Sequence, residues 1–134
     1  MGNFVLVEPD YPKVPEILLS TVEPFAESLE YRQLSEAERR LPGVVAASFT
    51  RFLVSLQESE ARDGLSSRNA TILERAYEAI EKLASSRDEQ VRTLVRDEIF
   101  ENLQGSELAW LLIERGLGSV SKAMFEDWRK ENPR

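Results

Sequence analysis

Residues 70–103 decide the fold, and they read ATILERAYEAIEKLASSRDEQVRTLVRDEIFENL. In each half of this stretch the apolar side chains recur at intervals of three and four residues, which is the spacing of one face of an α-helix. A short polar break at 85–88 separates the two halves. Helices with so short a connection must lie antiparallel, so the stretch predicts a helical hairpin over 70–84 and 88–103.

Helical spacing continues on both sides of this hairpin. Upstream, it predicts helices over 16–29 and 44–58, and Pro24 is expected to kink or split the first of them. Downstream, it predicts a helix that ends near Arg115 and a last helix over 119–130. Because no segment shows sustained strand alternation, we expect an all-α fold, a compact bundle of about six helices with the hairpin at its centre.

The remaining stretches are expected to be extended or irregular. Three prolines in residues 1–15 predict an extended lead-in, and whether Phe4–Val7 forms a short strand stays open. This apolar run is far shorter than the ~7–15 residues of a signal peptide or the ~20 of a membrane span, so we expect a cytoplasmic protein. The most polar stretch, 59–69, is expected to be a loop that turns at Gly64. The length fits a single helical domain spanning 1–134.

Short signals mark several helix ends and faces. Ser35 with Glu38, and Ser86 with Glu89, have the spacing of capping boxes. Gly116 is expected to end its helix in the left-handed conformation. The apolar faces expected for the last two helices carry Leu108, Leu111 and Leu112, and then Val120, Met124 and Trp128.

The second helix of the hairpin begins SRDEQVR at 86–92 and continues with apolar residues at helical spacing as far as Leu103. This pattern resembles the second helix of a HEAT-type repeat, in which Asp stands at the helix start and Val-Arg follows three residues later. The resemblance implies that Asp88 caps the helix, that Val91 enters the core and that Arg92 lies along the seam between neighbouring units. No second copy of the pattern occurs, so the implied unit is a HEAT-like hairpin over 70–103 and not an extended array.

The whole chain also resembles a class of short, acidic, helical bacterial proteins of unknown function in its size, charge and helix order. Some members of that class are suspected immunity proteins, which neutralise toxins. This resemblance implies that the partner is a basic enzyme or toxin.

The composition excludes several kinds of chemistry. Cysteine and histidine are both absent, so disulfides, thiolate or imidazole metal sites and triads built on these residues are excluded. The net charge of −7 disfavours nucleic acid and anionic membranes, because both require a basic face. We expect no cofactor and no bound metal, and either a basic protein partner attracted by the acidic charge or a charge that serves solubility alone.

Carboxylates are the main candidate site residues, and they are densest at 88–89 and at 97, 98 and 101. Asp97 and Glu101 are four residues apart and share a helix face opposite the apolar one. That face is either a partner-binding surface or merely solvated. Arg92 and Arg96 flank the apolar stripe, where each can hold an anionic group or form a structural ion pair.

Three aromatic residues lie off the expected apolar faces. Phe100 is expected either to pack on the following helix or to face solvent, and Trp110 poses the same question. An exposed patch of Phe100, Trp110 and Phe125 would be an interface, because aromatic side chains dominate protein–protein contacts.

These observations predict a non-catalytic protein-binding module, most sharply an immunity-type inhibitor of a basic enzyme or toxin. The alternative is a self-associating structural or adaptor protein, a homodimer that buries Phe100 and Trp110. An enzyme using only carboxylates would need an inward pair of Asp or Glu residues, and the periodicity shows none.

Overall fold

A computed structural model describes residues 9–63, 66–103 and 107–132 of the chain. Within these ranges the chain contains eight α-helices, short 3-10 and π segments, and no strand, so the predicted all-α fold is confirmed. The question of a strand at Phe4–Val7 lies outside the described residues.

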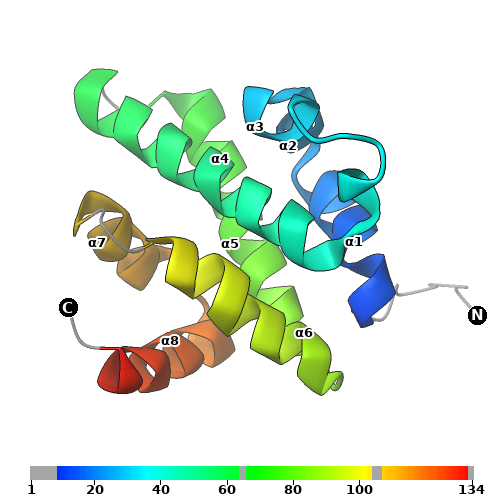
Figure 1. The fold of residues 1–134 in the computed structure, drawn as a ribbon. Coiled ribbons are helices and arrows are strands. Elements are labelled where there is room, and N and C mark those ends of the chain that lie inside the picture. Colours follow the sequence, from blue (N-terminus) through cyan, green and yellow to red (C-terminus); the bar gives the residue numbers. More distant parts are fainter. Residues whose placement is uncertain (1–8, 64–65, 104–106, 133–134) are drawn as a thin grey trace, which may run out of the picture.

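The α-helices run along the chain in the order shown in Figure 1, joined by short links. Their bounds are α1 (Val14–Thr21), α2 (Glu23–Glu27), α3 (Leu29–Arg32), α4 (Pro42–Asp63), α5 (Ser67–Ala84), α6 (Glu89–Leu94), α7 (Glu107–Gly116) and α8 (Ser119–Glu131). Four further helical segments are η1 (Tyr11–Lys13), η2 (Glu38–Arg40), the π-helical η3 (Val95–Phe100) and η4 (Glu101–Leu103).

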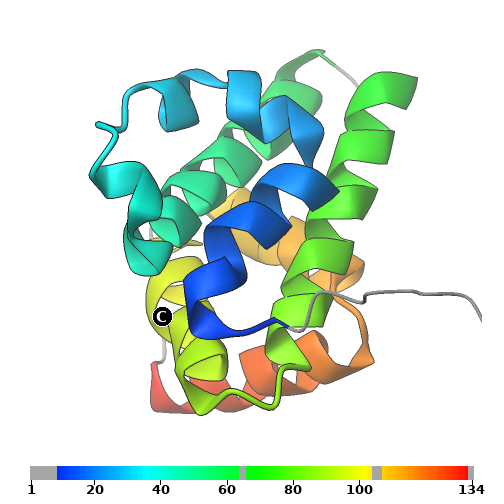
Figure 2. The same ribbon diagram turned by 90° about the vertical axis from the view of Figure 1, so that its right-hand side faces the viewer.

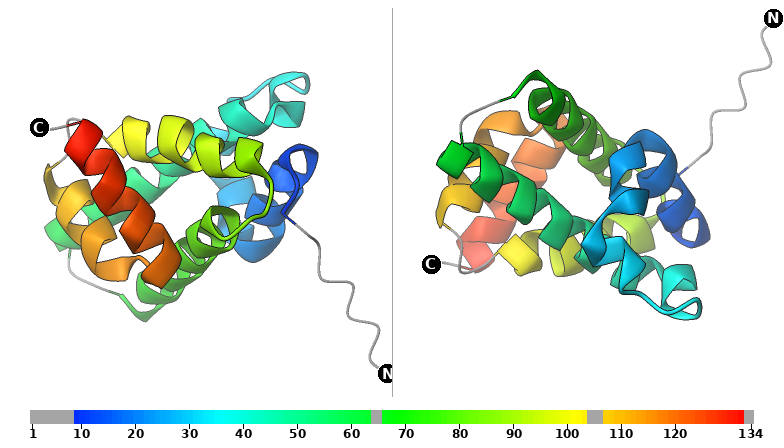
Figure 3. Two further views of the ribbon diagram at one scale, coloured as in Figure 1. Left: turned by 90° about the horizontal axis from the view of Figure 1, so that it is seen from below. Right: turned by 90° about the horizontal axis from the view of Figure 1, so that it is seen from above.

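The long helix α4 organises the bundle. It contacts α1, α3, α5 and α7, and its most extensive contact is with η3, which continues α6. Figure 2 shows α1 lying across α4 and α5, and both helices contact it. The views along the vertical axis in Figure 3 show the helices arranged around a common centre, which the buried apolar side chains fill.

Two clusters of aromatic rings occupy the two ends of this core. One joins α2 and α3 to α4, and the other joins η3 and α7 to α8. The first contains Phe25, Tyr31, Phe49 and Phe52, and the second contains Phe100, Trp110, Phe125 and Trp128.

Two stretches expected to be irregular contain helix in the described residues. The predicted lead-in 1–15 becomes helical at Tyr11, because Pro12 and Pro15 stand in first turns, where the missing N–H has no helical partner. The predicted loop 59–69 is also wrong over most of its length, since α4 continues to Asp63 and α5 begins at Ser67. Polar residues on an exposed helix surface carry no signal that ends the helix.

Two local features predicted from the sequence are present in the structure. The split at Pro24 is confirmed, because α1 ends at Thr21 and α2 begins at Glu23. The capping box of Ser35 and Glu38 is also confirmed, with reciprocal hydrogen bonds of 3.1 and 2.8 Å between side chains and backbone N–H groups.

The predicted capping box of Ser86 and Glu89 is wrong. The N-cap of α6 is Asp88, whose Oδ1 accepts from the N–H of Gln90 at 2.9 Å. The Ser86 hydroxyl accepts from the N–H of Asp88 and donates to the carbonyl of Pro9 at 2.6 Å. Ser86 therefore belongs to the link before α6, which it ties to the N-terminal segment.

The π segment η3 changes which residues of the helical segment from Glu89 to Phe100 face the core. In a π turn the hydrogen bonds join residues i and i+5, so Phe100 comes to lie one turn above Val95 on the buried face. An ideal α-helix would have turned Phe100 away from that face. Phe100 is instead fully buried, with its ring against Phe125 and Trp128.

The predicted face of α7 is wrong at Leu111, which is 54% exposed, whereas Trp110 and Ile113 are buried. The side chains of the other two residues expected on that face, Leu108 and Leu112, lie outside the described set. In α8, Met124 and Trp128 are buried as predicted, together with Ser121 and Phe125, and the prediction is wrong only at Val120, which is 43% exposed.

Gly116 serves close packing and not a left-handed turn. Its φ lies outside the left-handed range, and it is still part of α7. A Cβ atom added at Gly116 would lie 2.2 Å from Cε2 of Tyr77 on α5. The missing side chain therefore lets α7 approach the Tyr77 ring.

Gly116→Ala is expected to lower the free energy of unfolding by about 1–3 kcal/mol, because the Tyr77 ring must shift. Gly43→Ala is the matched control, since its Cβ would lie 3.6 Å from the nearest atom, Cγ of Glu98, which is an ordinary contact. We expect that variant to be neutral or to gain up to ~1 kcal/mol. Urea unfolding of both variants checks this, and equal stabilities would contradict the packing argument.

Candidate functional site

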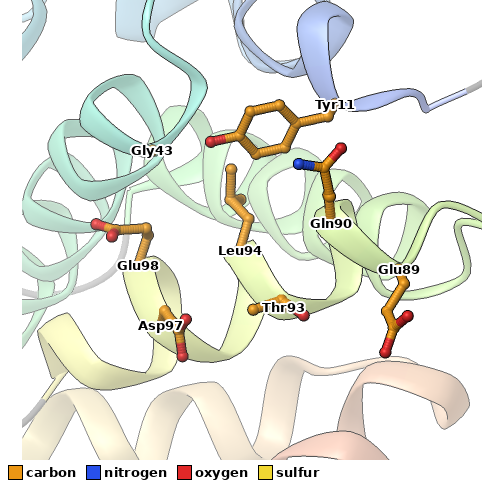
Figure 4. Close-up of a pocket in the computed structure, with 8 residues that line it drawn as sticks. All are labelled: Tyr11, Gly43, Glu89, Gln90, Thr93, Leu94, Asp97 and Glu98. Atoms are coloured by element: carbon orange, nitrogen blue, oxygen red, sulfur yellow. The ribbon is translucent and has the colours of Figure 1, made fainter.

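An open hollow of about 350 Å³ lies where η1 and the N-terminal turn of α4 meet α6 and η3. Figure 4 shows Tyr11 above the helix that carries most of the lining, with Glu98 towards Gly43 and Glu89 at the opposite end. We call this hollow the acidic groove, and its lining residues are Tyr11, Gly43, Glu89, Gln90, Thr93, Leu94, Asp97 and Glu98.

The link between α5 and α6 fixes the wall formed by Tyr11. The backbone N–H of Tyr11 donates to Oδ2 of Asp88 at 2.9 Å, across 77 residues of sequence. Next to it, Ser86 donates to the carbonyl of Pro9. Nη1 of Arg92 donates in turn to the carbonyl of Ser86 at 2.7 Å, which steadies the link. Arg92, a candidate binding residue, is therefore half-buried and has a structural hydrogen bond.

The opposite end of the groove is fixed by a contact between η3 and α4. The buried Thr50 hydroxyl lies 2.9 Å from the carbonyl of Ala46 and 3.3 Å from the carbonyl of Glu98. This contact between a side-chain hydroxyl of α4 and a backbone carbonyl of η3 joins the two elements. As a result, the side chain of Glu98 lies beside Gly43 in the first turn of α4.

Carboxylates dominate the electrostatics of the acidic groove. No lysine or arginine lines it, and among the described residues the carboxylates of Glu89, Asp97 and Glu98 have neither an ion pair nor a hydrogen bond. Burial raises the pKa of the half-buried Glu98 carboxyl, and the neighbouring charge of Asp97 raises it further. The groove thus concentrates negative charge that the fold leaves uncompensated.

A second acidic hollow, of about 280 Å³, lies between α5 and the link from α7 to α8 and has a different character. Its Glu81 carboxylate accepts from the N–H of Val120 at 3.1 Å and from the N–H and hydroxyl of Ser121 at 2.8 and 2.7 Å. Burial alone would raise the pKa of Glu81, but these hydrogen bonds outweigh it and lower the pKa. Glu81 therefore caps α8, and we assign it a structural role.

The predicted site residues are dispersed. Asp97 lines the acidic groove, whereas Glu101 is exposed and is not among the lining residues. Arg96 is exposed beside a different hollow, where Asp127 and Lys130 also lie.

The aromatic candidates lie in the core. Phe100 and Trp110 are buried, and Nε1 of Trp110 donates to the carbonyl of Leu103 at 3.0 Å. Arg129 covers the outside of the cluster, 5.2 Å from the ring of Trp110 and 5.7 Å from that of Phe125. The hypothesis that Phe100, Trp110 and Phe125 form an exposed interface patch is therefore wrong.

The sequence did not identify Tyr11 as a lining residue of the groove. From the acidic group at 97, 98 and 101 it predicted Glu101, which lies outside the groove, instead of Glu98, which lines it. Tyr11 carries no local signal, since its position depends on a hydrogen bond to the distant Asp88. Recognising Glu98 required the π register, which places it at the contact between η3 and α4.

The chemistry available to the acidic groove is that of carboxylates, one amide and two hydroxyl groups. In the described part of the chain, no group of three or more Asp and Glu side chains is placed to hold a metal ion. Nor does any helix of the described ranges have the length and apolar character needed to cross a membrane. Because the groove is open on one side, a positively charged side chain can approach its carboxylates from solvent.

Comparison with known proteins adds no assignment. No protein-family model, curated protein or solved structure matches the chain.

The two kinds of carboxylate predict opposite effects on stability. Glu98 has a raised pKa, so its contribution favours the folded state at acid pH and is lost as the pH rises through that pKa. Glu81 has a lowered pKa, so its contribution is present at neutral pH and is lost as the pH falls through that pKa. At neutral pH, Glu98→Gln is expected to raise the melting temperature and Glu81→Gln to lower it.

Thermal unfolding of the two variants and the wild-type chain at neutral and acid pH checks this prediction. The Glu98→Gln difference should disappear once the wild-type carboxyl is protonated. A loss of stability in Glu98→Gln at neutral pH would show that Glu98 has a stabilising partner.

Proposed function

We propose that this chain is a non-catalytic protein-binding module that holds a positively charged side chain of its partner in the acidic groove. The observation that carries the proposal is the set of three carboxylates, Glu89, Asp97 and Glu98, that line one hollow without a cation. A Lys or Arg side chain placed there would relieve the repulsion between Asp97 and Glu98.

The charge of the whole chain supports the same partner class. A net charge of −7 attracts a basic protein from a distance and speeds encounter, while the groove supplies a defined contact. The half-buried Glu98 contributes more than an exposed carboxylate, because charges interact more strongly where water is partly excluded. A basic enzyme or toxin inhibited by this chain, as an immunity protein would inhibit it, is our preferred partner.

The HEAT-like character of residues 70–103 and the cytoplasmic location stay predictions from the sequence. Phe100 and Trp110 are both buried, so these side chains do not offer a surface for self-association. A homodimer would have to use another face of the molecule.

Charge reversal tests the proposal. Affinity capture from a lysate of the source cells, washed at low and high salt, should recover a basic protein that high salt releases. Glu89→Lys combined with Asp97→Lys should abolish this capture, because both exposed residues line the groove. The matched control combines Glu58→Lys with Glu126→Lys, two exposed carboxylates outside it, and should capture the partner as the wild-type chain does.

Two outcomes would contradict the proposal. One is capture of the same basic protein by the groove variant and the wild-type chain, since the groove would then not be the contact. The other is recovery of the chain alone, which would favour the self-associating alternative.

A further inference from the structure

Another hollow, of about 450 Å³, adjoins the acidic groove along α4, and we call it the neighbouring hollow. It shares Tyr11, Gly43 and Glu98 with the acidic groove, so the two form adjacent parts of one depression. The other lining residues of the neighbouring hollow are Leu41, Val44, Ala47 and Arg51.

Three apolar side chains, those of Leu41, Val44 and Ala47, line this hollow along α4. Leu41, just before α4, is 51% exposed. Val44 and Ala47 follow at a spacing of three residues and are half-buried, so they continue the apolar strip along the outward face of α4. We call this part the apolar step, and it begins where the acidic lining ends at Glu98.

We propose that the acidic groove and the apolar step together bind one short segment of a partner protein, in which an Arg or Lys side chain stands beside an apolar side chain. The inference rests on the proposed function and specifies the partner more closely. The basic side chain lies against Asp97 and Glu98, and the apolar side chain covers Leu41 and Ala47. The alternation of a charged and an apolar subsite is what distinguishes this segment from a merely basic one.

Arg51 gives the segment a direction. It is exposed at the end of the apolar step away from the carboxylates of Glu89 and Asp97. A second basic residue placed over the step would meet the like charge of Arg51, and its desolvation would also oppose binding. A segment that is basic throughout therefore fits the depression less well than one with a basic residue at one end and an apolar residue at the other.

The test uses short blocked peptides of Gly and Ser that carry Arg alone, Leu alone, Arg twice, or Leu beside Arg. Each peptide is titrated into the full chain and followed by NMR. The peptide with Leu and Arg is expected to bind about tenfold more tightly than the peptide with Arg alone, because burial of the Leu side chain adds to the charge contact. Its binding should shift the amide signals of both Ala47 and Asp97.

Variants of the chain separate the two subsites. Leu41→Ser should remove the tenfold gain from Leu while the Arg peptide binds unchanged. Leu111→Ser is the matched control, because it removes another exposed leucine outside the groove and should keep the gain. Asp97→Asn should weaken both the Arg peptide and the peptide with Leu and Arg.

The outcomes distinguish this inference from the proposed function. If peptides with Arg alone and with Leu and Arg bind equally, the apolar step is not used and the inference fails, while the acidic groove stands. If the peptide with Arg twice binds most tightly, attraction is that of a general polycation and the inference fails. If no Arg peptide binds, both the inference and the proposed function fail.

Discussion

The contact between η3 and α4 is the constraint on which the rest of the structure depends. The π turn brings Phe100 onto the buried face, where its ring completes the aromatic cluster with Phe125 and Trp128. The same turn sets the Glu98 carbonyl within reach of the buried Thr50 hydroxyl. With the inner face held in this way, Asp97 and Glu98 have to line the outer side, beside the first turn of α4. The acidic groove is thus a direct consequence of how the core is packed.

The carboxylates of Glu81 and Glu98 have opposite pKa shifts, because their surroundings differ. Glu81 has hydrogen-bond donors on α8 and a lowered pKa, so its charge stabilises the fold. Glu98 has a raised pKa and a like charge beside it, so its ionised form is a cost to the fold at neutral pH. Unpaired charged groups that lower the stability of the free protein are characteristic of binding sites, where a bound partner neutralises their charge. This contrast distinguishes the Glu98 carboxyl of the groove, which has no hydrogen-bond donor among the described residues, from the Glu81 carboxyl, which has three.

The sequence predicted the helical class and several local features because those depend on neighbouring residues. The stripe through 70–84, the break at Pro24 and the cap formed by Ser35 and Glu38 all follow from spacing within a few residues. The groove did not follow, because Tyr11 reaches it through a hydrogen bond 77 residues away and Glu98 through a π turn that an ideal helix does not contain. The burial of Trp110 and Phe125 did not follow for a similar reason, since the face that a helix buries depends on which neighbours pack against it.

The central claim is that Glu98 is a half-buried carboxylate that the fold leaves without a partner. The most direct test follows the side-chain carboxyl carbon of Glu98 by 13C NMR through a pH titration. The account predicts a midpoint for Glu98 above the ordinary value of a glutamate side chain, and a smaller elevation in Asp97→Asn, where the neighbouring charge is removed. A Glu98 midpoint at or below the ordinary value would contradict the account, because the groove would then hold no crowded, unpaired charge for a partner to neutralise.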